Sequence, residues 1–322
     1  MRAVRINERG DPDVLTVEDI PMPHPGPEEV RVRIEAAGLN FIDIYHRDGR
    51  YDLELPITPG VEGAGVVDAV GGRVEGFAPG DRVAWAMGPG AYAEYAVVPS
   101  RLLVGVADEV DLRLAAAVML QGMTAHYLSH TTYPLKAGDT CLVTAAAGGV
   151  GHLLVQLAKE RGARVIATVS TEEKEKLARQ AGADEVVRYT EVLMVEAVRD
   201  LTDGRGVDVV YDSVGKDTFA QSLRCLRPRG FLVLYGQASG RVEPQDPQVL
   251  NDHGSLYLTR PSLAHHIAER EELEERAGYL FSAMAKGSLV VRVDRTFALE
   301  EAADAHRHME GRQTKGKVLL VP

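Results

Sequence analysis

Cysteine and aromatic residues are scarce in this chain, and it has no long apolar run. Only two cysteines, Cys141 and Cys225, occur among 322 residues. That number excludes both a disulfide framework and a cysteine-rich zinc site. No uncharged apolar stretch approaches the ~20 residues that cross a bilayer. The N-terminus has no basic segment followed by an apolar one, so we expect no signal peptide and a cytoplasmic location.

Positive charge is also in deficit. Lys and Arg number 36 against 47 Asp and Glu, and the formal net charge is −11. Nucleic acids and anionic membranes are bound through clustered Lys and Arg, so we expect neither as a partner. Apolar residues make up 45% of the chain and charged residues 26%, as in ordinary globular proteins. The length allows two domains of usual size.

The pattern of apolar residues changes along the chain. The first 120 residues contain short apolar runs cut by Gly and Pro, and Val30–Ile34 alternates as a half-buried strand does. From Thr140 onward, short apolar runs alternate with helical segments, which predicts a buried parallel sheet of doubly wound α/β type. The expected strands are Cys141–Thr144, Arg164–Val169, Glu185–Val187, Val207–Tyr211, Phe231–Tyr235 and Leu256–Thr259. The expected helices of this region are Val150–Arg161 and Glu172–Ala181. The last segment predicts a helix at Glu269–Ala285, a strand near Val290–Val293, a helix at Leu299–Met309 and a strand at Lys317–Val321.

A glycine-rich loop follows the first strand of this alternation. Gly148 and Gly151 lie where a predicted strand ends and a predicted helix begins. In that context Gly148 lets the backbone approach a pyrophosphate, and Gly151 lets helix and strand pack closely. The helix start supplies N–H groups and a positive dipole end for the phosphates. Ala146 replaces the first glycine of the usual motif, and a tight turn without ligand is the alternative interpretation. Within a complete strand–helix–strand unit, we predict a dinucleotide site.

The end of the second strand indicates which dinucleotide is bound. Proteins specific for NAD place an acid there, and Val169-Ser170 offers none. Glu173 is expected to form a capping box with Ser170 at the following helix start. Lys174 lies one turn into that helix and is within reach of a 2′-phosphate. The alternative for Lys174 is a solvated surface lysine.

The sequence resembles a known family, the zinc-free quinone oxidoreductases (zeta-crystallin-like) of the medium-chain dehydrogenase/reductase superfamily. The matching stretches run nearly end to end and are Ala36–Asp43, Pro59–Gly65, Ala145–Gly151, Tyr211–Gly215 and Gly254–Ser262. The resemblance implies a GroES-like β-rich substrate domain and a Rossmann NADPH-binding domain, with a cleft between them. We expect residues 1–124 to form the first part of the substrate domain, 125–262 the NADPH domain, and 263–322 a return segment that completes the substrate domain.

The resemblance also implies the site residues. Asn40 and Tyr45 are expected beside the nicotinamide, and Tyr51 near the substrate opening; these three are the expected catalytic residues. Ser170, Lys174 and Tyr189 are expected around the 2′-phosphate. The expected NADPH contacts are Asn40, Tyr45, Thr124, Gly148, Gly149, Val150, Gly151, Ser170, Lys174, Tyr189, Gly236 and Arg312.

No metal is expected. Zinc dehydrogenases of the superfamily have Cys where this chain has Asn40, and His where it has Val61. Zinc requires donors such as Cys or His, which Asn and Val do not replace. His126 and His130 have helical i, i+4 spacing, but we expect a helix position near the domain junction rather than a metal site. Without the Lewis acid, oxidation of simple alcohols is disfavoured.

These observations predict hydride transfer from NADPH to a quinone, with the developing oxyanion stabilised by hydrogen bonds from Tyr45, Tyr51 and Asn40. The proton donor, either solvent or Tyr45, stays open. Reduction of activated carbon–carbon double bonds in enals or enones is an alternative on the same fold. A binding protein with a structural or RNA-binding role is a third alternative, which the acidic net charge disfavours.

The strand expected at Ser255–Thr259 is the last of the predicted sheet. An exposed apolar edge there invites pairing with a second copy, so we predict a homodimer through this strand. The resemblance implies the same arrangement. The alternative is that residues 264–275 cover the edge.

Overall fold

The computed structural model describes all 322 residues, which divide into two compact units. Unit 1 comprises residues 1–123 and 267–322, and unit 2 comprises residues 124–266. The second domain expected from the sequence, residues 125–262, likewise lies in the chain between the two parts of the first domain. No helix is long and apolar enough to cross a membrane.

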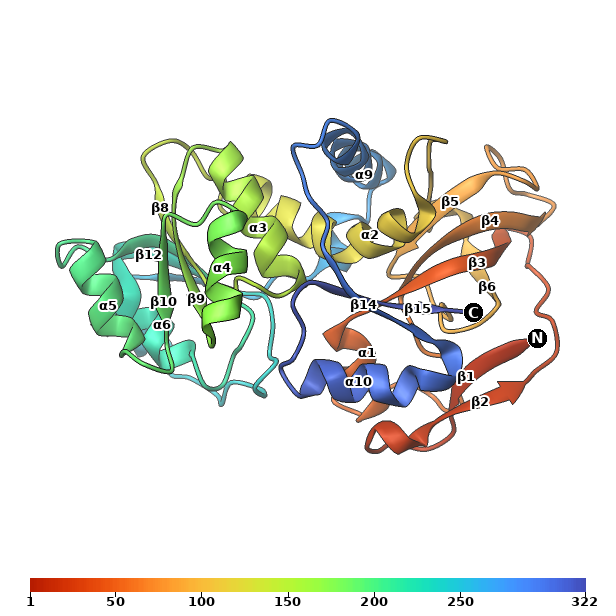
Figure 1. The fold of residues 1–322 in the computed structure, drawn as a ribbon, viewed down its shortest axis with the longest axis horizontal. Coiled ribbons are helices and arrows are strands. Elements are labelled where there is room, and N and C mark those ends of the chain that lie inside the picture. The colour runs from red at the N-terminus through yellow and green to blue at the C-terminus, as the bar shows by residue number, and fades with distance from the viewer. The chain divides into compact units, whose positions relative to one another are not determined.

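A seven-stranded sheet organises unit 1, with a separate pair formed by β1 and β2. The strands run in the order β14-β15-β3-β4-β5-β7, and β6 also pairs with β3. Their bounds are β1 Arg2–Ile6, β2 Leu15–Asp19, β3 Glu29–Leu39, β4 Glu62–Val70, β5 Arg82–Ala86, β6 Tyr95–Pro99, β7 Leu103–Gly105, β14 Val293–Ala298 and β15 Lys317–Val321. β15 pairs antiparallel with the end of β3, so both parts of the chain share one sheet (Figure 1).

Apolar alternation explains the core of unit 1. Val30, Val32 and Ile34 of β3 are buried, and they share a core cluster with Trp85 and Tyr92. Helices α1 Phe41–Arg47, α9 Arg270–Ala285 and α10 Ala302–Glu310 belong to this unit. Helix α2 Leu112–Tyr127 begins in unit 1 and ends in unit 2. It continues as a short π-helical segment, Leu128–Thr132.

Unit 2 is the predicted doubly wound parallel sheet. Its strands run in the order β10-β9-β8-β11-β12-β13, and every neighbouring pair is parallel. Their bounds are β8 Thr140–Val143, β9 Arg164–Val169, β10 Glu185–Arg188, β11 Val207–Asp212, β12 Leu226–Leu234 and β13 Tyr257–Thr259. The helices are α3 Gly149–Glu160, α4 Glu172–Gln180, α5 Met194–Leu201, α6 Phe219–Cys225, α7 Gln248–Asp252 and α8 Leu263–His266. Helices α3 and α4 pack on β8, β9 and β10, whereas α6 packs on β11 and β12.

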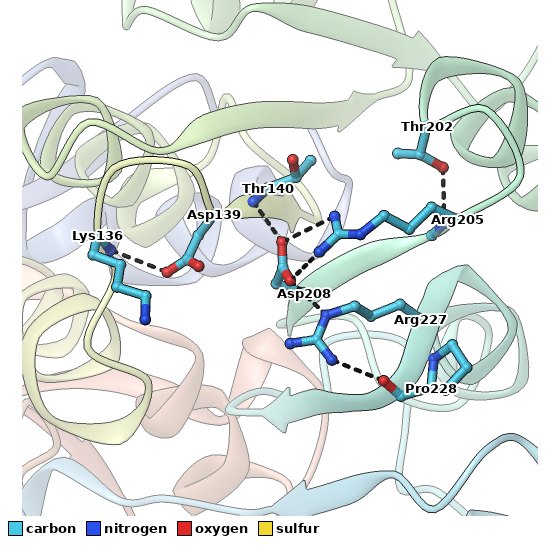
Figure 2. Close-up of polar contacts among 9 residues, drawn as sticks. Lys136, Asp139, Thr140, Thr202, Arg205, Asp208, Arg227 and Pro228 are labelled. Carbon is cyan, nitrogen blue, oxygen red and sulfur yellow. Dashed lines mark hydrogen bonds and ion pairs between the residues drawn. The ribbon is translucent and has the colours of Figure 1, made fainter.

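An acidic residue joins three strands at the amino end of this sheet. Figure 2 shows the Asp208 carboxylate between the guanidinium groups of Arg205 and Arg227. It accepts hydrogen bonds from Arg205 Nη2 at 2.6 Å, Arg227 Nε at 2.5 Å and the Thr140 N–H at 2.8 Å. Burial raises the pKa of Asp208, but the bonds from Arg227, Thr140 and Arg205 outweigh it and lower that pKa overall. The amino ends of β8, β11 and β12 are thereby held by one charged group.

Several predicted elements differ from the observed ones. The strand expected near Val290–Val293 begins only at Val293, where pairing with Lys317 of β15 starts. The helix expected at Leu299–Met309 opens as a short 3-10 turn before α10. Helices α1, α5, α6 and α7 were not predicted, because their five to eight residues carry too few turns for a clear apolar period.

The start of α4 also differs from prediction. Thr171, not Ser170, is the N-cap, and its hydroxyl accepts the Lys174 N–H at 3.2 Å. The expected capping box between Ser170 and Glu173 is therefore wrong. Ser170 instead lies one residue before the cap, where its carbonyl accepts a hydrogen bond from the Thr190 hydroxyl at 3.0 Å.

Candidate functional site

The strand order of unit 2 creates a switch point between β8 and β11. From β8 the chain proceeds outward through β9 and β10, and from β11 it proceeds the other way through β12 and β13. In such sheets a crevice forms beyond the carboxyl ends of the two central strands, and ligands bind there. The segments that leave those ends are the glycine loop at residues 145–151, residues 213–218 after β11 and residues 235–240 after β12.

The glycine loop turns sharply from β8 into α3. Ala145 has a left-handed backbone with φ 49°, and its carbonyl accepts the Gly148 N–H at 2.9 Å. Gly148 is the N-cap of α3, so no side chain caps the first turn, and that turn contains no acid. A Cβ on Gly151 would overlap the Ala145 carbonyl, so only glycine allows this approach of helix and loop. The N–H groups at the start of α3 and its dipole form a site for an anion.

Ser170 and Tyr189 follow the carboxyl ends of two neighbouring strands. Val169 pairs with Arg188, and the Val169 carbonyl accepts the Tyr189 N–H at 3.2 Å. The Tyr189 side chain is 44% exposed. Lys174 lies in the first turn of α4 and is half-buried. Thus the structure gathers Ser170, Tyr189 and the start of α4 at one edge of the sheet.

The acids near this edge have other contacts. Glu172 forms an i, i+4 ion pair with Lys176 at 2.8 Å, and the Lys176 hydrogen bond lowers the pKa of Glu172. Glu175 pairs with Arg179 at 2.9 Å and with Arg188 at 3.1 Å. No acid follows β9 directly, as the sequence already indicated.

Asp212 organises the third segment and was missed by the sequence reasoning. Its fully buried carboxylate accepts the N–H groups of Val214 at 2.8 Å and Gly215 at 3.2 Å. It also accepts the hydroxyls of Thr218 and Ser222, both at 2.8 Å. An acid at the end of a strand was the available signal. These four donors fix the loop that borders the switch point.

Two further predicted contacts lie in unit 2. Gly236 follows β12, and a Cβ there would overlap the Ser213 carbonyl, so the chain passes closely beside the Asp212 loop. Thr124 is buried within α2.

His126 and His130 stack with ring centroids 4.1 Å apart. No group of three or more His, Cys, Asp or Glu side chains is placed to hold a metal ion.

Tyr45 and Tyr51 meet in unit 1. Their rings are 5.3 Å apart in an edge arrangement, and the Tyr51 N–H donates to the Tyr45 carbonyl at 2.9 Å. Tyr45 is 5% exposed, whereas Tyr51 is 38% exposed. The Arg50 guanidinium lies 4.3 Å from the Tyr45 ring centroid. An exposed and a buried phenol are therefore adjacent, next to a cation. Arg312, also in unit 1, is exposed and has a left-handed backbone between α10 and β15.

Asn40 is buried, and its side-chain amide is fully hydrogen-bonded. Nδ2 donates to the Gly38 carbonyl at 3.0 Å and to Glu62 at 2.7 Å. Oδ1 accepts from Gln121 Nε2 at 3.2 Å and from Lys317 Nζ at 2.9 Å. An amide has two donor hydrogens and two acceptor lone pairs, so all four are used within unit 1.

Known proteins resemble the chain over its whole length. Residues 26–108 match the alcohol dehydrogenase GroES-like domain, and residues 149–275 match the zinc-binding dehydrogenase domain. A quinone oxidoreductase of Pseudomonas aeruginosa is 48% identical over 97% of both chains. The chain belongs to the quinone oxidoreductase family. A 2-haloacrylate reductase of a Burkholderia species is 46% identical over 99% of this chain and 98% of its own. The crystal structure of Escherichia coli quinone oxidoreductase complexed with NADPH has a TM-score of 0.98, 40% identity and full coverage of both chains.

Membership of the quinone oxidoreductase family confirms the predicted α/β fold, in which a GroES-like domain is joined to a Rossmann domain. Asn40 and Val61, where we expect zinc dehydrogenases to have their ligands, provide an amide and an apolar side chain, and both residues lie outside the match to the zinc-binding dehydrogenase domain. The Lys317 ammonium instead bonds to the Asn40 side chain. Lys317 and Gln121 gave no signal in the sequence, because a lysine at a strand start and a glutamine in a helix are common surface residues.

Proposed function

We propose that the protein is an NADPH-dependent quinone reductase. The observation that carries the proposal is the uncapped start of α3 at the switch point of unit 2, combined with the absence of an acid after β9. The first feature suits a pyrophosphate and the second admits a 2′-phosphate. The chain is similar over nearly its full length to quinone oxidoreductases, one of which was solved in complex with NADPH, and this similarity supports the same activity.

In this proposal unit 2 binds the dinucleotide. The N–H groups of Gly149, Val150 and Gly151 hold the pyrophosphate, and Ser170, Lys174 and Tyr189 hold the 2′-phosphate. Thr124 and Gly236 contribute on the nicotinamide side, and Arg312 of unit 1 is assigned a further contact with NADPH. When bound, NADPH supplies the hydride.

The residues of unit 1 act on the quinone. Tyr45 and Tyr51 donate hydrogen bonds to the oxygen that gains negative charge, which lowers the energy of the transition state. The proton that completes the hydroquinone comes from Tyr45 or from water. The Asn40 amide already has four partners, so we assign it to holding the polypeptide beside the nicotinamide rather than to donating to the quinone.

The test is NADPH oxidation with a panel of quinones, enals, enones and 2-haloacrylate. We expect turnover with ortho- or para-quinones and none with primary alcohols in the reverse direction. Turnover of the alkenes with no active quinone would replace this function by reduction of activated double bonds, which the Burkholderia relative favours. Tight NADPH binding with no turnover of any substrate would favour a binding protein.

Elemental analysis of the same preparation is a necessary control. We expect no stoichiometric zinc and no effect of chelators, because the Asn40 amide and the Val61 side chain are not zinc donors. One zinc per chain, removed with loss of activity, would contradict this expectation. We also propose a cytoplasmic location, which the two buried and unpaired cysteines support.

A further inference from the structure

A buried ion pair lies against Asn40 in unit 1. Lys317 is the first residue of β15 and Glu62 the first of β4, and their side chains are 1% and 0% exposed. The ammonium contacts Glu62 Oε2 directly. The other Glu62 oxygen accepts the Leu120 N–H at 2.5 Å. Burial lowers the pKa of Lys317, while Glu62 and Asp43 act to raise it.

The surrounding backbone is shaped to fit this pair. A Cβ on Gly38 would overlap both Glu62 and Lys317, so the glycine of β3 makes room for them. Taking two charges out of water costs several kcal/mol per ion, and well-packed apolar side chains often stabilise a fold as much or more. Stability alone therefore does not account for the pair, and its contacts indicate another role.

Those contacts determine how the Asn40 amide is oriented. Lys317 donates to Oδ1, whereas Glu62 accepts from Nδ2. Because a cation contacts one side of the Asn40 amide and an anion the other, only one of the two orientations related by an amide flip satisfies both contacts. The backbone N–H of Asn40 donates to Asp43 at 2.8 Å, and helix α1 begins at the next residue.

We propose that Lys317 is a positioning residue that fixes, through Glu62 and Asn40, the start of helix α1 and thereby the Tyr45 phenol. Tyr45 lies one turn into that helix, and Tyr51 is attached to it by a backbone hydrogen bond. The ammonium thus holds the helix that carries Tyr45 and to which the backbone of Tyr51 is hydrogen-bonded. This inference rests on the proposed function only for the role of the two tyrosines.

The experiment compares three variants with the wild type. Lys317→Met removes the charge and keeps a flexible side chain of similar length. Glu62→Gln combined with Lys317→Met removes both charges of the pair, so that neither partner is left as a buried ion without the other. Arg276→Met is the control, because Arg276 is another buried cation of unit 1, paired with Glu272 on α9 and not in contact with Asn40.

Two readouts are needed. Hydrogen exchange in ligand-free protein reports on the amides of Asp43, Ile44 and Tyr45 without any substrate. Steady-state kinetics separate kcat from KM, and titration gives the NADPH dissociation constant. We expect Lys317→Met to raise exchange at these amides and to lower kcat by about tenfold, equivalent to ~1.4 kcal/mol in the barrier. NADPH affinity should fall less than kcat, because the loops expected to hold the pyrophosphate and the 2′-phosphate lie in unit 2 and only the expected contacts of Asn40 and Tyr45 are disturbed.

The double variant decides between positioning and mere stability. We expect it to regain thermal stability while exchange in α1 stays high and kcat stays low. Recovery of kcat together with stability would show that the pair is only structural and would overturn the proposal, as would unchanged exchange in Lys317→Met. If no substrate is turned over by the wild type, the proposed function fails, but the exchange result still tests the link from Lys317 to α1.

Discussion

Selection of the cofactor is decided at single residues. Lys174 lies in the first turn of α4, beside Ser170 and Tyr189, and we expect its ammonium to meet a 2′-phosphate. A charge-assisted hydrogen bond contributes roughly 1.5–3 kcal/mol. Lys174→Ala should therefore weaken NADPH binding by about one to two powers of ten and leave NADH binding nearly unchanged. Fluorescence titration with both cofactors measures this.

Lys176 provides a matched control for that experiment. It lies on the same helix, is exposed and pairs with Glu172, so Lys176→Ala should affect neither cofactor. Equal losses for both cofactors in Lys174→Ala would show that the lysine does not recognise the phosphate. A wild-type preference for NADH would contradict our interpretation of the end of β9.

A second residue predicts a dependence of stability on pH. Burial raises the pKa of Asp43 from 3.8 to about 7, although hydrogen bonds from Asn40 and Tyr92 oppose the rise. The folded protein therefore binds this proton more tightly than the unfolded chain. The resulting stabilisation is complete below about pH 4 and is lost as the pH rises through about 7, by up to ~1.4 kcal/mol per pH unit.

Asp43→Asn removes the titrating group and is the comparison that isolates it. The free energy of unfolding of the wild type relative to this variant should fall between pH 4 and pH 7, as measured by urea denaturation at each pH. The sign is opposite to that of Asp208, whose lowered pKa gives a stabilisation that is lost as the pH falls. A difference that is constant across this range would contradict the raised pKa of Asp43.

At the scale of elements, the junction of β8 and α3 permits no side chain at Gly151. Gly151→Ala should destabilise the protein by about 1–3 kcal/mol, since the added methyl overlaps the Ala145 carbonyl. NADPH binding should weaken as well, because the start of α3 must shift. Thermal denaturation with and without NADPH tests both effects.

Gly278→Ala is the corresponding control. Gly278 lies in the interior of α9, where an added Cβ meets nothing within 4 Å. This variant should gain about 0.5–1 kcal/mol, because alanine favours a helix over glycine. If Gly151→Ala is as stable as this control and binds NADPH with full affinity, the close packing of α3 on the loop is not required for stability or for NADPH binding.

The predictability of the elements follows from their length and burial. Strands β9 and β15 were predicted residue for residue, because short and mainly apolar runs that follow a helix and a turn are typical of buried strands. Helix α1 was missed because its seven residues are fixed by Asp43 and by tertiary packing rather than by a periodic pattern. The cap of α4 was misplaced by one residue, since both Ser170 and Thr171 have the side chain of an N-cap.

The residues of the candidate site also differ in how far they could be predicted from the sequence. The glycine loop could be identified from sequence because its spacing has a local backbone cause. The contact between Lys317 and Glu62 could not, because the two residues are 255 positions apart and only the pairing of β3 with β4 and β15 brings them together. Asp212 acts on its own loop, but an acid at a strand end does not reveal how many donors it accepts.

At the scale of the whole molecule, we expect a homodimer. Strand β13 is the edge of the sheet in unit 2, and Tyr257 and Leu258 on it are 52% and 40% exposed. Such an edge presents unpaired backbone groups and apolar side chains to a second copy. Light scattering at micromolar concentration should give twice the 34.9 kDa mass of the chain.

Leu258→Lys should shift the protein to the monomer, because it places a charge in the expected interface. Val290→Lys is the control, since Val290 is 59% exposed but belongs to unit 1. A wild-type mass of 34.9 kDa under the same conditions would reject the dimer. A dimer that persists in Leu258→Lys would place the interface on another surface.

The pairing of β15 with β3 has a consequence for biosynthesis. Strand β3 is synthesised before unit 2, but its neighbour β15 and the cation that neutralises Glu62 are synthesised only after unit 2 is complete. Unit 2 is contiguous and can fold while the remainder is still being translated. Until β15 is made, unit 1 has an unpaired edge at β3, and the Glu62 carboxylate has no counter-ion. We therefore expect the nascent chain to depend most on chaperones between the completion of unit 2 and the emergence of β15 from the ribosome.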